Sequence, residues 1–270
     1  METLPIATRL SVRLKLMKKQ ISALPWLDPG DPFPPLRTAW THEDAAPGLL
    51  AAGGVLDTPT LLRAYASGIF PWFSDGQPIL WWSPDPRMVL KVQNFKLHRS
   101  LRKTLGLFNA RDDCEIRMDT CFESVVRACA SKPRNGQSGT WIVEEMFNAY
   151  VALNHSGHAH SVETWVGGVM VGGLYCVNVG GMVFGESMFA HTTDASKIAL
   201  AALVTWCRAN QIDWIDCQQN TQHLASLGAT EIPRDTFEDH LRQTTRQPTP
   251  LWSFSSCCWR HLLPNNCDRL

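Results

Sequence analysis

A carboxylate and a carboxamide stand two positions apart in the segment WIDCQ, residues 214–218. The apolar residues before them predict a strand. Because side chains alternate along a strand, Asp216 and Gln218 should share one face, opposite Cys217. Side by side at a strand end, the two groups can orient an amine and relay its proton, and general base catalysis of this kind accelerates reactions by about 10²–10⁴-fold. An aspartate at this position can equally cap the helix that follows.

A second polar group follows an apolar stretch. Residues 169–189, VMVGGLYCVNVGGMVFGESMF, predict two strands joined by a turn in which Gly180–Gly181 adopts positive φ. Glu186, Ser187 and Met188 then leave the end of the second strand, where open α/β sheets bind ligands. A surface carboxylate followed by a core methionine would give the same pattern.

A third candidate is an indole behind a glycine-containing loop, KPRNGQSG, residues 132–139. We expect Thr140 to be the N-cap of a helix over residues 143–154, with Trp141 presented at its start. A flat indole there can stack on a nucleic-acid base. It can also pack as a hydrophobic staple at the helix start.

Other chemistries lack their sequence patterns. His155, His158 and His160 lie close together, but no further ligand cluster completes a metal site. The Cys- and His-containing segment 257–267 matches no closed zinc site. Phosphate-cradling patterns such as GxGxxG and GxxxxGK[ST] are absent, as is the GxSxG elbow of serine hydrolases. We therefore expect neither a metal nor a cofactor.

Composition limits the class of protein. The 270 residues are 44% hydrophobic and 19% charged, which is typical of a globular chain with a sizeable core. No apolar run reaches the roughly 18 residues of a membrane helix, and Arg and Lys interrupt the N-terminal apolar residues, unlike a secretory signal. Nine cysteines without CxxC spacing fit free thiols in a reducing compartment. We expect a cytoplasmic protein with no membrane contact.

The formal net charge is zero, so a nucleic-acid site must come from local clusters of basic residues. Residues 1–32 form a basic amphipathic arm and a Pro-rich linker, which suit either a nucleic-acid or membrane surface or a frayed extension. The strongest internal basic patch lies on and just before a predicted helix over residues 98–106. It can meet phosphates or form a solvated helix face. Its members are Lys96, Arg99, Arg102 and Lys103.

The pattern of elements predicts an α/β (α+β) fold with a small N-terminal lobe over residues 33–87. In the lobe, Thr58 should cap a helix with Pro59 in its first turn, and the aromatic segments 70–73 and 79–87 should pair as a hairpin. Strands and helices then alternate over residues 88–245, and residues 246–270 are irregular. We predict further strands over 88–92, 114–118, 159–166 and 212–218 and helices over 121–131 and 194–208.

Taken in order, these segments resemble one family, the leucyl/phenylalanyl-tRNA–protein transferases. The resemblance covers roughly residues 33–240. The matching segments are FPP (33–35), PGLLAAGG (47–54), LLRAYASGIFPWFSDGQPILWWSPDPR (61–87), GTWI (139–142), GHAHSVE (157–163), VGG (171–173), GESMF (185–189), ASK (195–197), IDCQ (215–218) and SLGATEIPR (226–234).

The resemblance implies that the lobe sits on an acetyltransferase-like (GNAT) domain with a mixed central sheet. It implies transfer of leucine or phenylalanine, and of methionine more weakly, from aminoacyl-tRNA to proteins with N-terminal Arg or Lys, which marks them for degradation. The expected partners are aminoacyl-tRNA and such acceptor proteins or peptides. No [QR]xxGx[GA] loop for a CoA pyrophosphate follows GESMF, which agrees with a donor other than acyl-CoA. We expect a monomer, because no long heptad pattern demands a partner.

The resemblance also implies residue roles. Trp72 and Trp141 would sandwich the terminal adenine of the tRNA. As the acceptor's α-amine attacks the ester carbonyl, Gln218 would orient the amine and Asp216 would withdraw charge or a proton from it. The aminoacyl pocket would be lined by Glu186, Ser187, Met188, Leu174, Leu200 and Ile215.

Two departures leave the leucine/phenylalanine balance open: Leu174 and Leu203 stand where the family carries a methionine and a bulkier aromatic residue. Two other functions also stay open. One is a GNAT-type aminoacyl or acyl transferase with a different amine acceptor. The other is a non-catalytic tRNA-binding module, which would have no need for Asp216 and Gln218.

Overall fold

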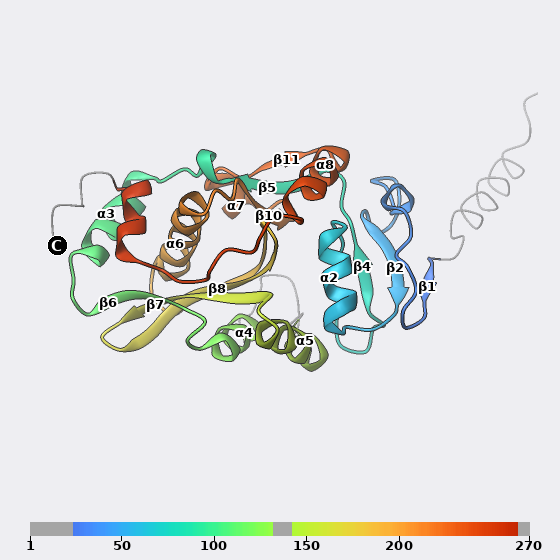
Figure 1. The fold of residues 1–270 in the computed structure, drawn as a ribbon, viewed down its shortest axis with the longest axis horizontal. Helices are drawn as coiled ribbons and strands as arrows, with labels where there is room; N and C mark the ends of the chain where they lie inside the picture. The colour runs from blue at the N-terminus through green and yellow to red at the C-terminus, as the bar shows by residue number, and fades with distance from the viewer. Residues whose placement is uncertain (1–23, 132–141, 264–270) are drawn as a thin grey trace, which may run out of the picture.

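The computed structural model describes residues 24–131 and 142–263. Its strands form two sheets, which lie side by side in Figure 1 with helix α2 (Thr58–Ala66) between them. The four-stranded sheet has the order β1-β2-β4-β3 and the seven-stranded sheet the order β11-β5-β10-β9-β8-β7-β6. The strands of the smaller sheet are β1 (Trp26–Leu27), β2 (Leu49–Gly53), β3 (Phe70–Pro71) and β4 (Leu80–Trp82). Those of the larger sheet are β5 (Arg87–Lys91), β6 (Cys114–Met118), β7 (Ala159–Val166), β8 (Val169–Val179), β9 (Met182–Ala190), β10 (Trp214–Gln218) and β11 (Thr230–Ile232).

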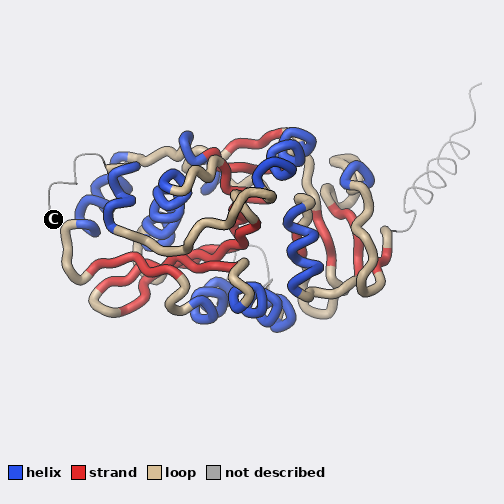
Figure 2. The backbone as a smooth tube through the Cα atoms, in the orientation of Figure 1, coloured by secondary structure: helices blue, strands red, loops and turns tan. Residues whose placement is uncertain are grey.

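Helices cover both faces of the larger sheet, as Figure 2 shows in blue against the red strands. Helices α4 and α5 pack on one face and α6 on the other, with α3 and η3 packed beside α6. The remaining bounds are η1 (Leu36–Thr38), η2 (Val92–Asn94), α3 (Arg99–Asn109), α4 (Phe122–Ala130), α5 (Glu144–His155), α6 (Ala195–Ala209), α7 (Gln222–Ser226), α8 (Arg234–Thr244) and η3 (Ser256–His261). The mixed α/β class with a small N-terminal lobe is thus confirmed, and the mixed sheet agrees with an acetyltransferase-like domain.

The hydrophobic core has two parts, one on each face of the larger sheet. The first runs from the smaller sheet across α2 to the face covered by α4 and α5. The second surrounds α6, which is apolar on all sides and therefore buried almost throughout. The lobe is thus packed through α2 onto the same core as the central strands, which fixes it beside them.

Among the strands that the structure describes in the larger sheet, β9 and β10 are the only parallel neighbours, and every other pair is antiparallel. Within the described strands their register ends at the pairs Ile215↔Val183 and Asp216↔Phe184. Past these pairs, β9 continues to Ala190 while β10 ends at Gln218. The two strands therefore diverge, and after Phe184 and Asp216 they no longer pair with each other.

Most predicted elements are confirmed, with local corrections. The hairpin forms through the pairs Phe70↔Trp82 and Pro71↔Trp81. Helix α2 is capped by Asp57, whose Oδ1 accepts the Thr60 N–H at 2.8 Å, so the prediction of Thr58 as N-cap is wrong.

Three further local predictions are also corrected. The N-cap of α5 is Val143, not Thr140, which lies outside the described residues. Gly180 has φ +59°, but Gly181 does not have positive φ. A Cβ at Gly181 would stand 2.1 Å from Oε1 of Gln247, so a side chain there would displace the end of the Gln247 side chain. Finally, Gly185–Phe189 lie inside β9 rather than after its end.

The C-terminal segment packs along the larger sheet. The Trp252 ring stacks on His160 at 4.1 Å and lies 4.0 Å from Trp206, and its Nε1 donates to Asn178 Oδ1 at 3.0 Å. Within residues 24–131 and 142–263, no group of three His, Cys, Asp or Glu side chains is placed to hold a metal ion. Nor does any helix in those ranges have the length and apolar character to cross a bilayer.

Candidate active site

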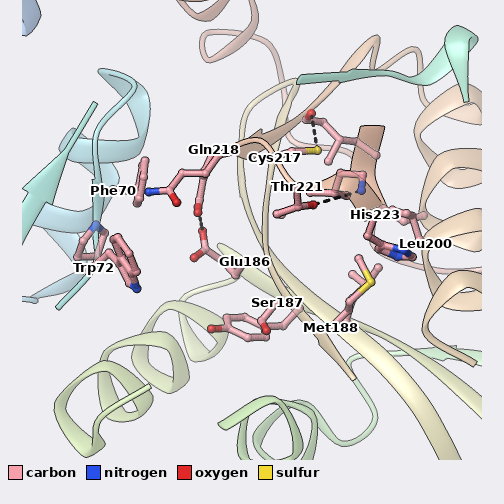
Figure 3. Close-up of a pocket in the computed structure, with 18 residues that line it drawn as sticks. Phe70, Trp72, Glu186, Ser187, Met188, Leu200, Cys217, Gln218, Thr221 and His223 are labelled. Carbon is pink, nitrogen blue, oxygen red and sulfur yellow. Dashed lines mark hydrogen bonds between the residues drawn. The ribbon is translucent and has the colours of Figure 1, made fainter. Parts of the chain in front are cut away.

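A cavity of about 450 Å³ opens where β9 and β10 diverge. Figure 3 shows Phe70 and Trp72 on its lobe side, facing Glu186 and Gln218, with Met188 on the opposite side. The lobe and both diverging strands therefore build one cavity, to which α7 adds a wall. The residues on its surface are Phe70, Pro71, Trp72, Leu174, Tyr175, Gly185, Glu186, Ser187, Met188, Leu200, Leu203, Ile215, Cys217, Gln218, Gln219, Thr221, His223 and Leu224.

A β-bulge in β9 turns its carboxylate toward the cavity. Tyr175 of β8 pairs with Ser187, whereas the next residue, Cys176, pairs with Gly185. Glu186 is therefore the extra residue of the bulge and is free of the regular alternation. A bulge at this point re-aims one side chain without ending the strand, which is why β9 continues past it.

The Glu186 carboxylate is surrounded by three donor groups from other elements. Its Oε1 accepts the Tyr65 hydroxyl at 2.8 Å and the Gln218 Nε2 at 3.1 Å, and its Oε2 accepts the Tyr150 hydroxyl at 2.7 Å. The two tyrosine oxygens are also 2.9 Å apart. Tyr65 belongs to α2 of the lobe and Tyr150 to α5, so this cluster joins the lobe to the larger sheet.

Burial raises the pKa of the Glu186 carboxyl group from 4.5 to about 7, although the hydrogen bonds from Tyr150, Tyr65 and Gln218 lower it. Counting protons gives an independent reason. Three short oxygen–oxygen contacts link Tyr65, Tyr150 and Glu186 pairwise, but the two tyrosine hydroxyls carry only two protons. A protonated Glu186 carboxyl group would supply the third proton, so that each contact could be a hydrogen bond. Glu186 can therefore gain or lose a proton near neutral pH.

Asp216 lies beneath the cavity rather than in its wall. Its side chain is completely buried, and Arg87 donates Nε to Oδ1 at 2.8 Å and Nη2 to Oδ2 at 2.6 Å. The Gln218 N–H also donates to Oδ1, at 2.9 Å. Both oxygens of Asp216 are thus occupied by groups of the protein.

The prediction that Asp216 and Gln218 share a face is wrong, because Gln218 lines the cavity and Asp216 does not. The register of β10 shifts between these two residues, and Gln218 has φ +62°. This irregularity breaks the alternation of the strand and turns Gln218 to the cavity side together with Ile215 and Cys217, while Asp216 points away.

The family model for leucyl/phenylalanyl-tRNA protein transferase matches residues 89–242, and the model for the N-terminal domain of the same family matches residues 54–85. The chain belongs to this family.

Relatives of the same description cover nearly the whole chain. The leucyl/phenylalanyl-tRNA–protein transferase of Polaromonas sp. strain JS666 is 63% identical over 247 residues, which are 92% of this chain and 97% of the relative. That of Albidiferax ferrireducens is 58% identical with the same coverage. Among solved structures, L-PGS from Bacillus licheniformis aligns with a TM-score of 0.36 at 10% identity, over 71% of this chain and 63% of that one.

In this transferase-family chain, all six residues predicted for the aminoacyl pocket line the same cavity. Their apolar members come from different elements: Leu174 from β8, Met188 from β9, Leu200 from α6 and Ile215 from β10. Leu203, one turn after Leu200, adds to the same wall. Cys217 also faces the cavity, but burial raises the pKa of its thiol to about 12, so it is no nucleophile at neutral pH.

Of the two predicted stacking indoles, Trp72 lines the mouth of the cavity, and Trp141 lies outside the described residues. The position of Trp72 is fixed by its neighbour in the hairpin. Trp82 Nε1 donates to the Trp72 carbonyl at 2.7 Å, and the two rings are 5.4 Å apart. Trp72 directly follows β3, and its own N–H donates to the Leu80 carbonyl at 2.9 Å, so hydrogen bonds to β4 hold the residue in place.

The predicted basic patch lies outside the cavity, on the exposed side of the α3 region. Two contacts join this region to α7, which lines the cavity: Lys96 N–H donates to the Leu227 carbonyl at 2.8 Å, and His98 Nε2 lies 2.7 Å from the Ser226 carbonyl oxygen. In the part of the chain that the structure describes, no acid is paired with any of the four basic residues. Their charges are available to a ligand.

Sequence reasoning missed Tyr65, Tyr150 and Arg87. The two tyrosines belong to apolar helix faces, so they were indistinguishable from packing residues. A signal was present nonetheless, because a buried tyrosine hydroxyl needs a hydrogen-bond partner. Arg87 was placed at the end of the lobe, but it is the first residue of β5 in the larger sheet.

Proposed function

We propose that this protein transfers leucine or phenylalanine, and methionine more weakly, from aminoacyl-tRNA to the α-amine of proteins that begin with Arg or Lys, which marks them for degradation. One observation carries the proposal beyond family membership. A single cavity combines an apolar wall, the polar pair Glu186 and Gln218, and the indole of Trp72 at its mouth. These are the groups needed for an apolar aminoacyl side chain, a reacting ester and a nucleotide base.

The donor would enter with its side chain against the apolar wall and its terminal adenosine at Trp72. Stacking of a base on an indole contributes about 1–3 kcal/mol and requires no base-specific contacts. Trp141 would cover the second face of the adenine. The basic patch of Lys96, Arg99, Arg102 and Lys103 would bind phosphates of the tRNA. Its contacts with α7 support a route along that helix to the cavity.

In the reaction, the nitrogen of the acceptor's α-amine attacks the ester carbonyl carbon. The new C–N amide bond forms as the bond between that carbon and the ribose oxygen breaks. Nitrogen loses one proton, and the ribose oxygen gains one. The Gln218 Nε2 donates to Glu186, so the amide oxygen of Gln218, Oε1, can accept an N–H of the incoming amine. Positioning of this kind supplies much of the acceleration, because the ester is already activated.

We assign the proton transfer to Glu186 rather than to Asp216. Glu186 lines the cavity and has a pKa of about 7, which suits exchange of a proton near neutral pH. The Asp216 oxygens are occupied by Arg87 and by the Gln218 N–H, so its part is to hold Gln218. In its ionised form, Glu186 also attracts the positively charged N-terminal residue of the acceptor.

Labelled leucine or phenylalanine on tRNA, offered to matched peptides beginning with Arg, Lys or Ala, tests the proposal. Label on the Arg and Lys peptides alone is expected. Label on all three, or only on a small amine, would indicate a transferase with another acceptor. If charged tRNA binds but no label moves, the protein is a tRNA-binding module. Size-exclusion chromatography of the same preparation tests the proposed monomer.

A further inference from the structure

A buried arginine lies directly behind the polar pair of the cavity. Arg87 is 1% exposed and does not line the cavity. Besides its two hydrogen bonds to Asp216, it donates Nη1 to the Gly68 carbonyl at 3.1 Å. Its Cζ also lies 4.9 Å from the Phe70 ring centroid and 4.8 Å from that of Phe237. The planar guanidinium is therefore fixed by hydrogen bonds along its edge and by aromatic rings.

These contacts connect the two parts of the molecule that form the cavity. Gly68 follows α2 of the lobe, and Phe70 belongs to β3, which contributes to the cavity wall. Asp216 belongs to β10 of the larger sheet. A shift of the lobe relative to that sheet would have to break the contacts of this one side chain, so the guanidinium holds the lobe wall in register with β10.

The same ion pair also determines where Gln218 lies. Its φ of +62° is uncommon for a residue with a side chain and needs support from the surroundings. The support is the Asp216 carboxylate, which accepts the Gln218 N–H. A carboxylate is a strong acceptor, and Arg87 makes its complete burial possible by supplying the opposite charge and two parallel hydrogen bonds.

We propose that Arg87 is a positioning residue for aminoacyl transfer: through Asp216 it sets Gln218 beside Glu186, and through Gly68 and Phe70 it sets the lobe wall opposite them. The proposal rests on the proposed function, because it is the orienting role of Gln218 that makes its position matter. Lysine cannot replace this arginine, since an ammonium is a point charge without the planar fork.

The main test compares Arg87→Lys with Arg208→Lys. Arg208 is a matched control because its guanidinium donates to the carbonyls of Val92 and His261 and does not line the cavity. For Arg87→Lys, we expect kcat to fall by about 10–100-fold, the scale of a slightly misplaced reacting group, with KM for aminoacyl-tRNA unchanged. For Arg208→Lys, both should stay at the wild-type values. A wild-type kcat in Arg87→Lys, or a change confined to KM, overturns the proposal.

A second variant separates positioning from folding. Replacing the pair together, Arg87→Met with Asp216→Leu, leaves no unpaired buried charge and should restore the thermal midpoint relative to Arg87→Met alone. Because the acceptor for the Gln218 N–H is gone, kcat should stay low. If the thermal midpoint and kcat both recover in the double variant, the ion pair serves stability alone and the proposal is overturned.

A measurement without catalysis keeps this test apart from the proposed function. Hydrogen exchange at the Gln218 N–H, followed by NMR, should accelerate at least about tenfold in Arg87→Lys and stay unchanged in Arg208→Lys. If the wild type transfers no amino acid, the proposed function fails, and the exchange rates still decide whether Arg87 holds Gln218. Unchanged exchange in Arg87→Lys overturns the proposal.

Discussion

Glu186 should make the stability of this protein depend on pH in a way that a single substitution removes. Burial raises the pKa of its carboxyl group from 4.5 to about 7. The folded state therefore binds the proton more tightly than the unfolded state does. The resulting stabilisation is fully present below pH 4.5 and is lost as the pH rises to about 7. Glu186→Gln keeps the shape of the side chain but cannot ionise, so it should lack this dependence.

The size of the effect follows from the two pKa values. Each pKa unit corresponds to about 1.4 kcal/mol, so the full difference is about 3 kcal/mol. Most of this change falls between pH 5 and pH 8, because that range lies above the unfolded pKa and spans the folded one. The free energy of unfolding of Glu186→Gln minus that of the wild type should therefore increase by about 2–3 kcal/mol over this range. The variant gains because it is spared the cost of ionising a buried group.

Urea unfolding at pH 5, 6, 7 and 8 measures this difference, and the eleven tryptophans give a fluorescence signal. Glu231→Gln is a suitable control, because Glu231 is an exposed carboxylate on β11 outside the cavity wall. Its curve should run parallel to that of the wild type. If the Glu186→Gln curve is also parallel, or if the difference shrinks as the pH rises, the reasoning about burial at Glu186 is refuted.

Three further predictions concern the donor and the reaction. Trp72→Ala should raise KM for aminoacyl-tRNA about tenfold through lost stacking. Trp26→Ala, at an exposed indole on β1 of the smaller sheet, should leave this KM unchanged. Steady-state kinetics with charged tRNA measure both values, and a wild-type KM in Trp72→Ala would contradict the stacking role. Gln218→Ala should lower the single-turnover rate about 10²-fold while tRNA binding by filter assay persists, and a normal rate would remove the orienting role. Arg102→Ala should reduce the slope of log K for tRNA binding against log salt concentration by about one. Arg111→Ala should not change this slope, because the Arg111 guanidinium is already paired with Asp113. Equal slopes for the two variants would mean that the tRNA binds elsewhere.

Local structure was predictable where the sequence pattern is regular. The strand at 114–118 was predicted with its observed bounds, because alternation and turn residues suffice for a short regular strand. The pocket is a different case: its apolar residues Leu174, Leu200 and Ile215 follow from the resemblance to the family and not from a local pattern, and the structure places all three in the cavity wall.

The orientation of Asp216 could not be predicted, because it depends on an irregularity in β10. Alternation with period two holds only while a strand is regular, and one bulge exchanges the faces of the residues after it. Whether a bulge forms depends on the neighbouring strands and on groups such as Arg87, which comes from 129 positions earlier in the chain. No local pattern near Asp216 carries that information.

The sequence by itself thus determined which residue types are available for the chemistry, the class of the fold and the family. Only the tertiary structure decided which of these residues meet. Tyr65 and Glu186 are 121 positions apart, and Tyr65 and Tyr150 are 85 positions apart, yet their oxygens form one cluster. The physical reason is that hydrogen bonding and the cost of burying charge depend on distances within the folded chain, whereas periodicity describes only neighbours along it.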